Sequence, residues 1–342
     1  MTQNGPTATD QEKHKWDAYY GALKDELEPT GSVAALYREL AETMAAVVSS
    51  GSKVLEAGCG SAQTSLALAR LGRYDVSLLD FSDEALAYAR RVFERAGVQA
   101  RFEVGDVLSG HDSAEHDLVF NSGVLEHYSF DDQVFFLRGM ARRSRRYVFV
   151  LVPNRACYWY WIWRIQTAAD GQWPFGYEKP ASSYRAAIEA AGLHDLGRVY
   201  LGASAVGHFL GSIAGLEPAL RERIIAVHQH EVVPLAQRSY LVGFLASITA
   251  DDVAPPTFAP DPATAEPEAD WADRYVTLAA DALSAHIAAQ QHVARLDKEV
   301  SELRAKVRAA ELELEYIRGA AKAEDGAGGA VSRLRRILSG RA

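Results

Sequence analysis

The stretch from residue 53 to residue 71 constrains the fold of this chain more than any other. Residues 53–57 have the length and apolar character of a short buried strand, and residues 61–71 are expected to form a helix. Gly58 and Gly60 lie between them and, lacking a Cβ, let the backbone bend sharply and a ligand approach closely. The following helix presents free N–H groups and a partial positive charge to the same point. This order predicts a ligand site at the carboxyl end of a strand in an open parallel α/β sheet.

A second strand at residues 76–80 ends in Asp80, about 20 residues past the glycine turn, a spacing at which an acid can accept hydrogen bonds from ribose hydroxyls. The third glycine of the dinucleotide fingerprint G-x-G-x-x-G would fall at Gln63. The pattern therefore does not indicate a bound pyrophosphate. Glu-x-Gly-x-Gly after a strand, with an acid closing the next strand, is a stronger signal than the glycines alone.

The chain resembles the class I S-adenosylmethionine (AdoMet) methyltransferases in four stretches that stand in the order and spacing of that family. They are VLEAGCGSAQTS (54–65), VSLLDFSDEALAYAR (76–90), FEVGDVL (102–108) and DLVFNSGVLEHY (117–128). The likeness covers about residues 50–155 well and continues more loosely to about residue 250. It implies an α/β fold with a Rossmann-like, seven-stranded, doubly wound sheet, AdoMet as the cofactor, and methyl transfer as the activity.

The resemblance also implies which residues bind AdoMet, all of them near the ends of the first four strands. They are Glu56, Gly58 and Gly60 at the methionine end, Asp80 at the ribose, Phe81 beside the adenine, Asp106 at the adenine amino group with Val107 next to it, and Asn121 and Ser122 closing the site. The alternative is an α/β domain that has a glycine turn and binds no nucleotide. That alternative requires four motifs to coincide by chance.

Three candidate catalytic residues, Glu126, His127 and Tyr128, follow the fourth strand near the place where the methyl group should point. An oxygen acceptor usually needs a base to take its proton, and the ordinary pKa of histidine suits neutral pH. We therefore expect His127 to be the base, although a histidine here could equally cap or pack. His208 and Glu178 are further candidates.

No metal site is expected. Some quinone-type O-methyltransferases that the chain resembles carry a Glu-x-x-Glu-His metal motif at this place. In this sequence the first acid of that motif is replaced by Gly123.

Two aromatic segments are candidates for a substrate lid. The first, within residues 1–30, contains Trp16, Tyr19 and Tyr20, and on a helix Trp16 and Tyr20 share a face. It either folds over the ligand or packs against the first helix of the domain. The second is an insertion at residues 154–177, whose aromatic side chains include Trp159, Trp161 and Trp163. It is expected to form a lid, a satellite core under a helix at about 204–230, or a shallow membrane contact.

The length of 342 residues exceeds one typical domain, and composition divides the chain. The methyltransferase domain is expected at residues 31–250. Residues 251–270 are rich in proline, alanine and acids and read as a linker. A helix at 271–320 carries apolar residues at alternating steps of three and four, which predicts a coiled coil or a helix lying on the catalytic domain. Residues 321–342 form a glycine-rich hinge and a basic amphipathic tail.

These segments predict a homo-oligomer formed through residues 290–318 and leave open whether residues 331–342 rest on an anionic membrane or are solvated. The net charge of −9 argues against a nucleic-acid partner. Two cysteines, Cys59 and Cys157, are too few for a disulfide framework. Residues 1–10 lack an apolar signal region, and no run of about 18 apolar residues occurs. We expect a cytoplasmic protein, with peripheral contact at the inner face of the membrane as an alternative.

The expected reaction is O-methylation of a glycan or another small molecule. The Asn/Asp-Pro-Pro-Tyr motif of nucleic-acid amino methyltransferases is absent, because residues 121–124 read Asn-Ser-Gly-Val. A methyltransferase domain, a linker and a terminal coil together resemble enzymes that modify cell-surface polysaccharides. The alternatives are a non-catalytic AdoMet-binding scaffold that assembles through its coil, and a protein or RNA methyltransferase, which the acidic charge disfavours.

Overall fold

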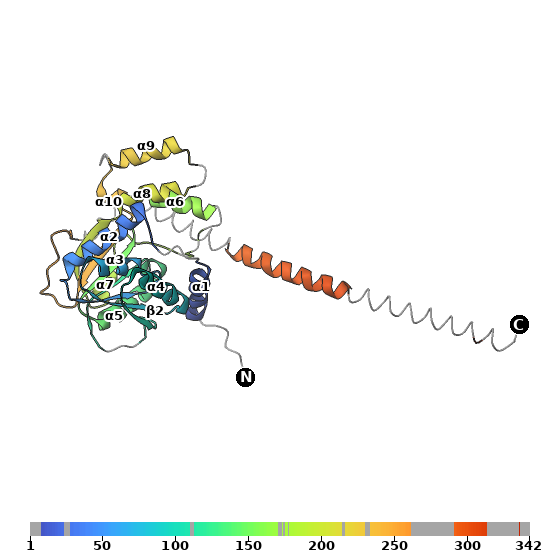
Figure 1. Cartoon of the computed structure of the whole chain (residues 1–342), viewed down its shortest axis with the longest axis horizontal. Helices are drawn as coiled ribbons and strands as arrows, with labels where there is room; N and C mark the ends of the chain where they lie inside the picture. Colours follow the sequence, from blue (N-terminus) through green and yellow to red (C-terminus); the bar gives the residue numbers. More distant parts are fainter. Residues whose placement is uncertain are drawn as a thin grey trace. The chain divides into compact units, whose positions relative to one another are not determined.

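The computed structural model describes residues 8–23, 28–109, 113–169, 173, 175–176, 178–213, 216–229, 233–260, 291–312 and 335. The chain divides into two compact units, residues 1–285 and residues 286–342 (Figure 1). Within the described part, no helix combines the length and the apolar character needed to cross a membrane.

The first unit is built on one seven-stranded sheet, which confirms the doubly wound α/β fold. The strand order is β3-β2-β1-β4-β5-β7-β6, and β7 runs antiparallel to both of its neighbours. The strands are β1 (Lys53–Ala57), β2 (Asp75–Asp80), β3 (Arg101–Val104), β4 (His116–Ser122), β5 (Ser144–Pro153), β6 (His194–Leu201) and β7 (Leu241–Ser247). The strand order reverses between β1 and β4, and at such a switch point the carboxyl ends of parallel strands leave a crevice for a ligand.

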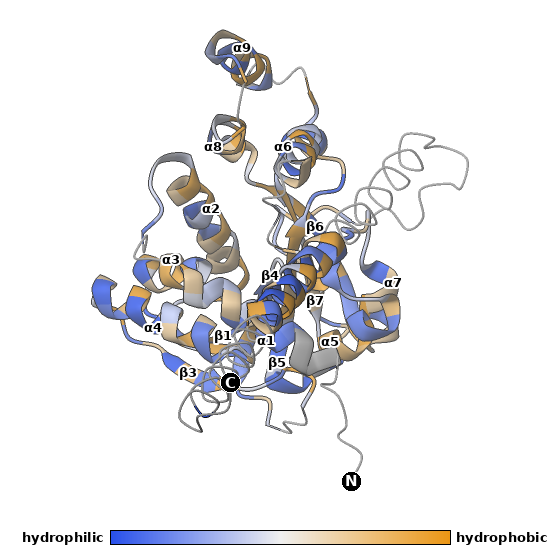
Figure 2. Cartoon of the chain, turned by 90° about the vertical axis from the view of Figure 1, so that its right-hand side faces the viewer, coloured by the Kyte–Doolittle hydropathy of each residue, from blue (hydrophilic) through white to orange (hydrophobic). Residues whose placement is uncertain are grey.

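The helices alternate with the strands and flank the sheet. They are α1 (Ala8–Ala22), α2 (Gly31–Val47), α3 (Gln63–Leu71), α4 (Asp83–Ala96), α5 (Phe130–Arg143), α6 (Tyr158–Ala169), α7 (Arg185–Ala190), α8 (Val206–Gly211), α9 (Pro218–Gln229) and α10 (Leu235–Arg238), with short 3-10 turns η1 (Leu125–His127) and η2 (Ala203–Ala205). Most of these helices carry hydrophilic residues as well as hydrophobic ones (Figure 2). Helices α4 and α5 pack their apolar sides on the strands and turn their polar sides to water.

Alternation along the strands divides the core between the two faces of the sheet. On one face, Leu78 of β2 packs in a cluster with residues of α3 and α4. On the other face, Leu79 packs in a cluster with residues of α5 and α7. Both leucines are almost fully buried, with exposed fractions of 0% and 1%. The two layers hold β2 rigidly, and so fix the place of Asp80 at its end.

Helix α7 begins at Arg185, where the Ser183 hydroxyl accepts the Arg185 N–H at 3.1 Å. Two other segments differ from the sequence-based expectation for local reasons. The helix expected at 204–230 is divided into η2, α8 and α9, and α9 starts at Pro218, which suits a first helical turn but not a helix interior.

The expected linker at 251–270 does not begin at residue 251. Phe258 is buried against the ring of Phe149, with the ring centroids 5.7 Å apart. Ala259 exchanges two backbone hydrogen bonds with Arg198 of β6, at 2.7 and 2.9 Å. Residues 251–260 are thus part of the folded unit, and residues 261–290 lie outside the described residues.

In the second unit, residues 291–312 form a helix, and every one of them is exposed. This segment lies within the helix expected at 271–320. Apart from residue 335, the predicted hinge and tail at 321–342 lie outside the described residues.

Candidate functional site

The glycine turn after β1 adopts backbone angles that side chains disfavour. Gly58 has φ 71° and Gly60 has φ 50°, both in the left-handed region. The N–H groups of Gly58 and Cys59 donate to the carbonyl of Leu79, at 2.8 and 3.1 Å. These bonds hold the turn against the end of β2. The loops that follow β1 and β2 therefore lie next to each other.

Asp80 closes β2 and faces this turn. One carboxylate oxygen accepts the Gly60 N–H and the other accepts the Ser82 N–H, both at 2.9 Å. Burial raises the pKa of Asp80, while the two backbone N–H groups work in the opposite direction. Each carboxylate oxygen can accept a further hydrogen bond, so the backbone orients the group without saturating it.

Glu56 is the second buried acid of the site and is 3% exposed. Burial raises its pKa to about 8, although hydrogen bonds with Ser65 favour the ionised form. Its Oε2 has no hydrogen-bond partner among the described residues. An acceptor left unpaired in an apolar interior is costly, and a bound cation or donor would relieve that cost.

These residues line one cavity of about 440 Å³, a size within the range of small-molecule sites. The structure brings together at this cavity eleven residues that the sequence singled out: Trp16, Tyr20, Glu56, Gly58, Gly60, Asp80, Phe81, Asp106, Ser122, His127 and Tyr128. The sequence did not single out the remaining lining residues: Glu12, Lys15, Tyr37, Cys59, Ser61, Ala62, Gln63, Thr64, Leu108, Gly123, Val124 and Asp132.

Several predicted site residues lie behind the cavity wall instead. Val107 is buried in the core with α5, and Asn121 is buried with its side-chain amide directed at the sulfur of Met140, 3.6 Å away. Glu126 is 2% exposed and does not line the cavity. Tyr19 packs against Trp16 and Phe175. A strand pattern tells which residues stand near a sheet edge, but Val107, Asn121 and Glu126 are buried inside the domain.

Helix α1 covers the glycine turn. The hydroxyl of Tyr20 lies so close to Gly60 that a Cβ on that glycine would stand 2.1 Å from it. Burial raises the pKa of Tyr20 well above its ordinary value, and the charge of Asp80 acts in the same direction. Tyr20 is therefore a neutral hydroxyl held above the turn, where it shields the site from water.

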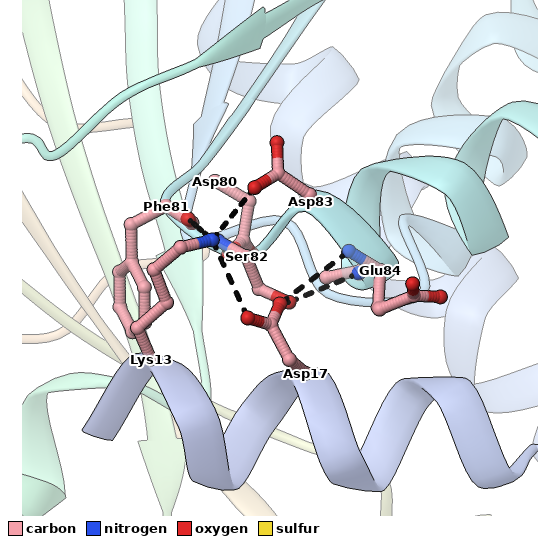
Figure 3. A network of polar contacts seen from close by, with 8 residues as sticks. Lys13, Asp17, Asp80, Phe81, Ser82, Asp83 and Glu84 are labelled. Carbon is pink, nitrogen blue, oxygen red and sulfur yellow. Dashed lines mark hydrogen bonds and ion pairs between the residues drawn. The ribbon is translucent and has the colours of Figure 1, made fainter. Parts of the chain in front are cut away.

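Two charged residues fasten α1 to the start of α4 (Figure 3). The ammonium of Lys13 donates to the carbonyl of Phe81 at 2.9 Å and to the carboxylate of Asp83 at 2.8 Å. Asp17 accepts the hydroxyl of Ser82 at 2.6 Å, and Ser82 in turn caps α4 by accepting the N–H of Ala85. We call Lys13 and Asp17 the latch. Both of its residues bind the segment immediately after Asp80.

The hydrogen bond with Asp83 is the largest factor raising the pKa of Lys13. Burial works against ionisation of Asp17, but the bonds from Ser82 and Glu84 and the charge of Lys13 together lower its pKa. Both groups are consequently charged at neutral pH. The i, i+4 spacing of Lys13 and Asp17 was a visible signal, although their partners lie too far along the chain to be read from it.

His127 ends the 3-10 turn η1 and lines the cavity. Its ring lies 6.0 Å from the ring of Trp16, edge to face. Tyr128 follows it on the same wall, and burial raises the pKa of its hydroxyl to about 12. Of the three catalytic candidates, His127 and Tyr128 can therefore touch a ligand, and His127 is the one whose ordinary pKa suits proton transfer near neutral pH.

A buried polar network supports η1 from behind. Tyr160 donates to the carboxylate of Glu178 at 2.7 Å, and the guanidinium of Arg164 donates to the Tyr160 oxygen at 2.9 Å. The neighbouring Lys179 N–H donates to the carbonyl of Glu126 at 2.8 Å. Burial raises the pKa of Glu126 well above its ordinary value, and the nearby charge of Glu178 adds to that rise. Glu126 and Glu178 are thus buried in the network that holds His127 in place.

The aromatic insertion mainly forms a satellite core. Trp159 is 0% exposed, stacks on Tyr240 and donates its indole N–H to the carbonyl of Arg238 at 2.8 Å. Trp163 packs against Phe209 of α8, with centroids 4.8 Å apart. Trp161 donates its N–H to the carbonyl of Arg155 at 2.7 Å. None of these three tryptophans is among the residues that line the described cavity. His208, a further candidate for the base, is exposed on α8 and does not line that cavity either.

One branch of the insertion nevertheless reaches α1. Trp163 contacts Trp173, Trp173 contacts Phe175, and Phe175 packs against Trp16, with centroid distances of 5.2, 5.2 and 6.4 Å. The satellite core therefore contacts α1 through Phe175. The described residues contain no cluster of three or more acids, histidines or cysteines that could hold a metal ion.

Residues 54–146 match a family model described as a methyltransferase domain. A comparison with curated proteins found no match.

Similar solved structures include the geranyl diphosphate C-methyltransferase of Streptomyces coelicolor A3(2), with 14% identity, a TM-score of 0.48, and coverage of 69% of this chain and 98% of that one. They also include the magnesium protoporphyrin IX methyltransferase of Synechocystis PCC 6803, with 15% identity, a TM-score of 0.44, and coverage of 70% and 94%. A third is a sarcosine dimethylglycine methyltransferase from Galdieria sulphuraria, with 15% identity, a TM-score of 0.41, and coverage of 70% and 99%.

The matched segment spans β1 to β5, and it carries the glycine turn, Asp80 and the wall that ends in His127. The sheet has the seven strands and the doubly wound order that the sequence resemblance implied. Residues 54–146 therefore carry a methyltransferase domain, built on a sheet of the Rossmann-like methyltransferase fold.

Proposed function

We propose that this enzyme transfers the methyl group of AdoMet to an oxygen of a small-molecule or glycan acceptor, with His127 as the base. The observation that carries the proposal is that His127 and Asp80 line the same cavity, although 47 positions separate them in the sequence. The cavity thus has a nucleoside-binding end and an end with a proton acceptor.

The residues at the glycine turn fit AdoMet. Asp80 is oriented by backbone N–H groups and retains free acceptor capacity for ribose hydroxyls. Glu56 places an unpartnered carboxyl oxygen in the same cavity, where it suits the amino group of a methionine moiety. Gly58 and Gly60 supply the left-handed backbone angles that the turn at this end of the cavity requires. Phe81 and Asp106 line the same cavity, where the proposal has Phe81 flank the adenine and Asp106 accept a hydrogen bond from its amino group.

When bound, AdoMet supplies an activated methyl group on a sulfonium. The chain contributes position and dryness: Asp80 and the glycine turn hold the donor, while Trp16 and Tyr20 of α1 shield the cavity. His127 takes the proton of the acceptor hydroxyl as the oxygen attacks, a role that contributes about 10²- to 10⁴-fold in rate where it operates. Tyr128 remains protonated at neutral pH and can donate a hydrogen bond to the acceptor.

The cavity wall favours a polar organic acceptor. Lys15, Glu12 and Asp132 line it beside the flat rings of Trp16 and Tyr128. Hydrogen-bonding groups next to aromatic rings are the combination that binds sugars and other hydroxylated molecules.

The test is methyl transfer from radiolabelled AdoMet to fractionated small molecules and glycans. We expect incorporation with the wild type and a loss of about 10²-fold or more in kcat for His127→Gln, with AdoMet affinity retained. The matched control is His208→Gln, because His208 is exposed on α8 and does not line the cavity. Equal turnover of the wild type and His127→Gln would refute the role of His127.

Two other outcomes separate the alternatives. Binding of AdoMet with no transfer to any fraction would favour a scaffold that keeps the fold without turnover. Label in protein or RNA fractions alone would replace the small acceptor with a macromolecule.

A further inference from the structure

The helix at residues 291–312 carries an apolar stripe that none of the described residues covers. Val293, Leu296, Val300, Leu303 and Val307 follow one another at steps of three and four, and their exposed fractions are 56, 43, 43, 59 and 57%. A repeat of this kind keeps one seam on the same side of a slightly underwound helix. The stripe belongs to the second unit, and the reaction proposed above uses none of its residues.

Such a helix needs a partner to be stable. An isolated helix of this length is marginal in water, because most helical stability in proteins comes from packing of the apolar side. Every residue from 291 to 312 is exposed, so no packing within the described residues stabilises this one. A second copy of the chain carries the same stripe. Its apolar residues therefore have the same spacing and can pack against those of the first copy.

The residue types in the stripe indicate how many helices pair and in which direction. The first apolar position of each heptad is valine, at 293, 300 and 307, and the second is leucine at 296 and 303. β-Branched residues at the first position with leucine at the second favour two parallel strands. In a parallel pair valine meets valine and leucine meets leucine, whereas an antiparallel pair mixes the two layers.

The charges beside the stripe are complementary in the same arrangement. In a parallel in-register pair, the residue directly before the first apolar position of each heptad lies near the residue that is five places further along in the partner helix. Three such pairs fall within residues 291–312: His292 with Asp297, Glu299 with Arg304, and Lys306 with Glu311. Each pairs an acid with a base. An antiparallel pairing would instead place Glu299 beside Lys306 and Asp297 beside Arg304, which are also opposite charges. The charges are therefore compatible with both directions, and the valine and leucine positions favour the parallel one.

We propose that residues 291–312 pair with the same segment of a second chain as a parallel, in-register, two-stranded coiled coil. The pair links two methyltransferase units through their carboxyl-terminal segments. It does not depend on the identity of the methyl acceptor, and its tests require no methyl transfer.

The first test is the mass of the full-length protein by sedimentation equilibrium. We expect a dimer, and conversion to monomer in Leu303→Asp, which puts a charge in the seam. The matched control is Leu312→Asp, because Leu312 is equally exposed, at 60%, but lies outside the stripe. A monomeric wild type, a trimer, or equal loss of the dimer in both variants would overturn the proposal.

The second test determines the direction by exchange of charges. Glu299→Lys and Arg304→Glu alone each put like charges opposite one another, and we expect each to weaken the dimer about tenfold. The double variant Glu299→Lys/Arg304→Glu restores opposite charges in a parallel pair and should recover most of the wild-type affinity. In an antiparallel pair the double variant breaks both contacts and is the weakest, a result that would refute the parallel arrangement. Glu302→Lys, which faces away from the seam, serves as the neutral control.

Discussion

Replacement of Gly60 by alanine tests whether α1 closes over the glycine turn. Gly60 has φ 50°, and a side chain in the left-handed region costs about 1–2 kcal/mol. The new Cβ would also stand 2.1 Å from the Tyr20 hydroxyl and 3.1 Å from the adjacent ring carbon. Because two such atoms cannot approach so closely, Tyr20 must move, and with it the part of α1 that shields the cavity.

Gly97 provides the matched control. It has φ 66° at the end of α4, and a Cβ there would meet nothing within 4 Å. Gly97→Ala therefore carries the backbone strain without the collision. We expect it to lower the free energy of unfolding by about 1–2 kcal/mol, which corresponds to a fall of roughly 2–8 °C in Tm for a domain of this size.

Gly60→Ala should show the same strain and, in addition, release α1. We expect chymotrypsin to cut at Trp16, Tyr19 and Tyr20 faster than in Gly97→Ala, and AdoMet affinity to fall only in Gly60→Ala. Tyr20→Ala combined with Gly60→Ala should relieve the collision and recover part of the lost stability. If Gly60→Ala and Gly97→Ala match in Tm, cleavage and AdoMet affinity, Tyr20 does not lie over the turn.

Two further predictions concern the latch and the buried acid. Lys13→Ala removes the contacts to Phe81 and Asp83, and we expect AdoMet to dissociate about two- to fivefold faster by stopped-flow measurement, with an unchanged rate contradicting the latch. The folded-state pKa of Glu56, about 8, lies above its ordinary value of 4.5, so its stabilising effect is complete below about pH 4.5 and is lost as pH rises through 8. The free energy of unfolding of the ligand-free wild type should therefore fall between pH 5 and pH 9, and it should fall by roughly 3–5 kcal/mol less in Glu56→Gln. Parallel pH curves for the two proteins would refute the raised pKa of Glu56.

The catalytic fold was predictable because its signals are local. A strand, two glycines, a helix and an acid closing the next strand stand close together in sequence, and the alternation of strands and helices predicts a doubly wound sheet. Asp80 and Gly60 accordingly lie where the pattern placed them, 2.9 Å apart from carboxylate oxygen to amide nitrogen.

The rest depended on contacts between distant segments. Lys13 meets Phe81 across 68 positions, and no pattern in either stretch announces that contact. Tyr37 reads as one more apolar position of α2, yet it lines the cavity. The run of aromatic residues in α6 could not be assigned to a lid or a core from composition, because burial depends on which side α8 covers. Residues 251–260 look like a linker, yet a single phenylalanine, Phe258, docks them on the sheet.

The central claim is that the glycine turn and Asp80 hold AdoMet, and calorimetric titration of purified protein with AdoMet tests it most directly. Wild-type protein should bind one AdoMet per chain. Asp80→Ala should weaken binding about 100-fold or more through loss of charged hydrogen bonds, while circular dichroism shows the fold retained. Equal affinity in the wild type and a folded Asp80→Ala variant, or no heat from either, would contradict the claim.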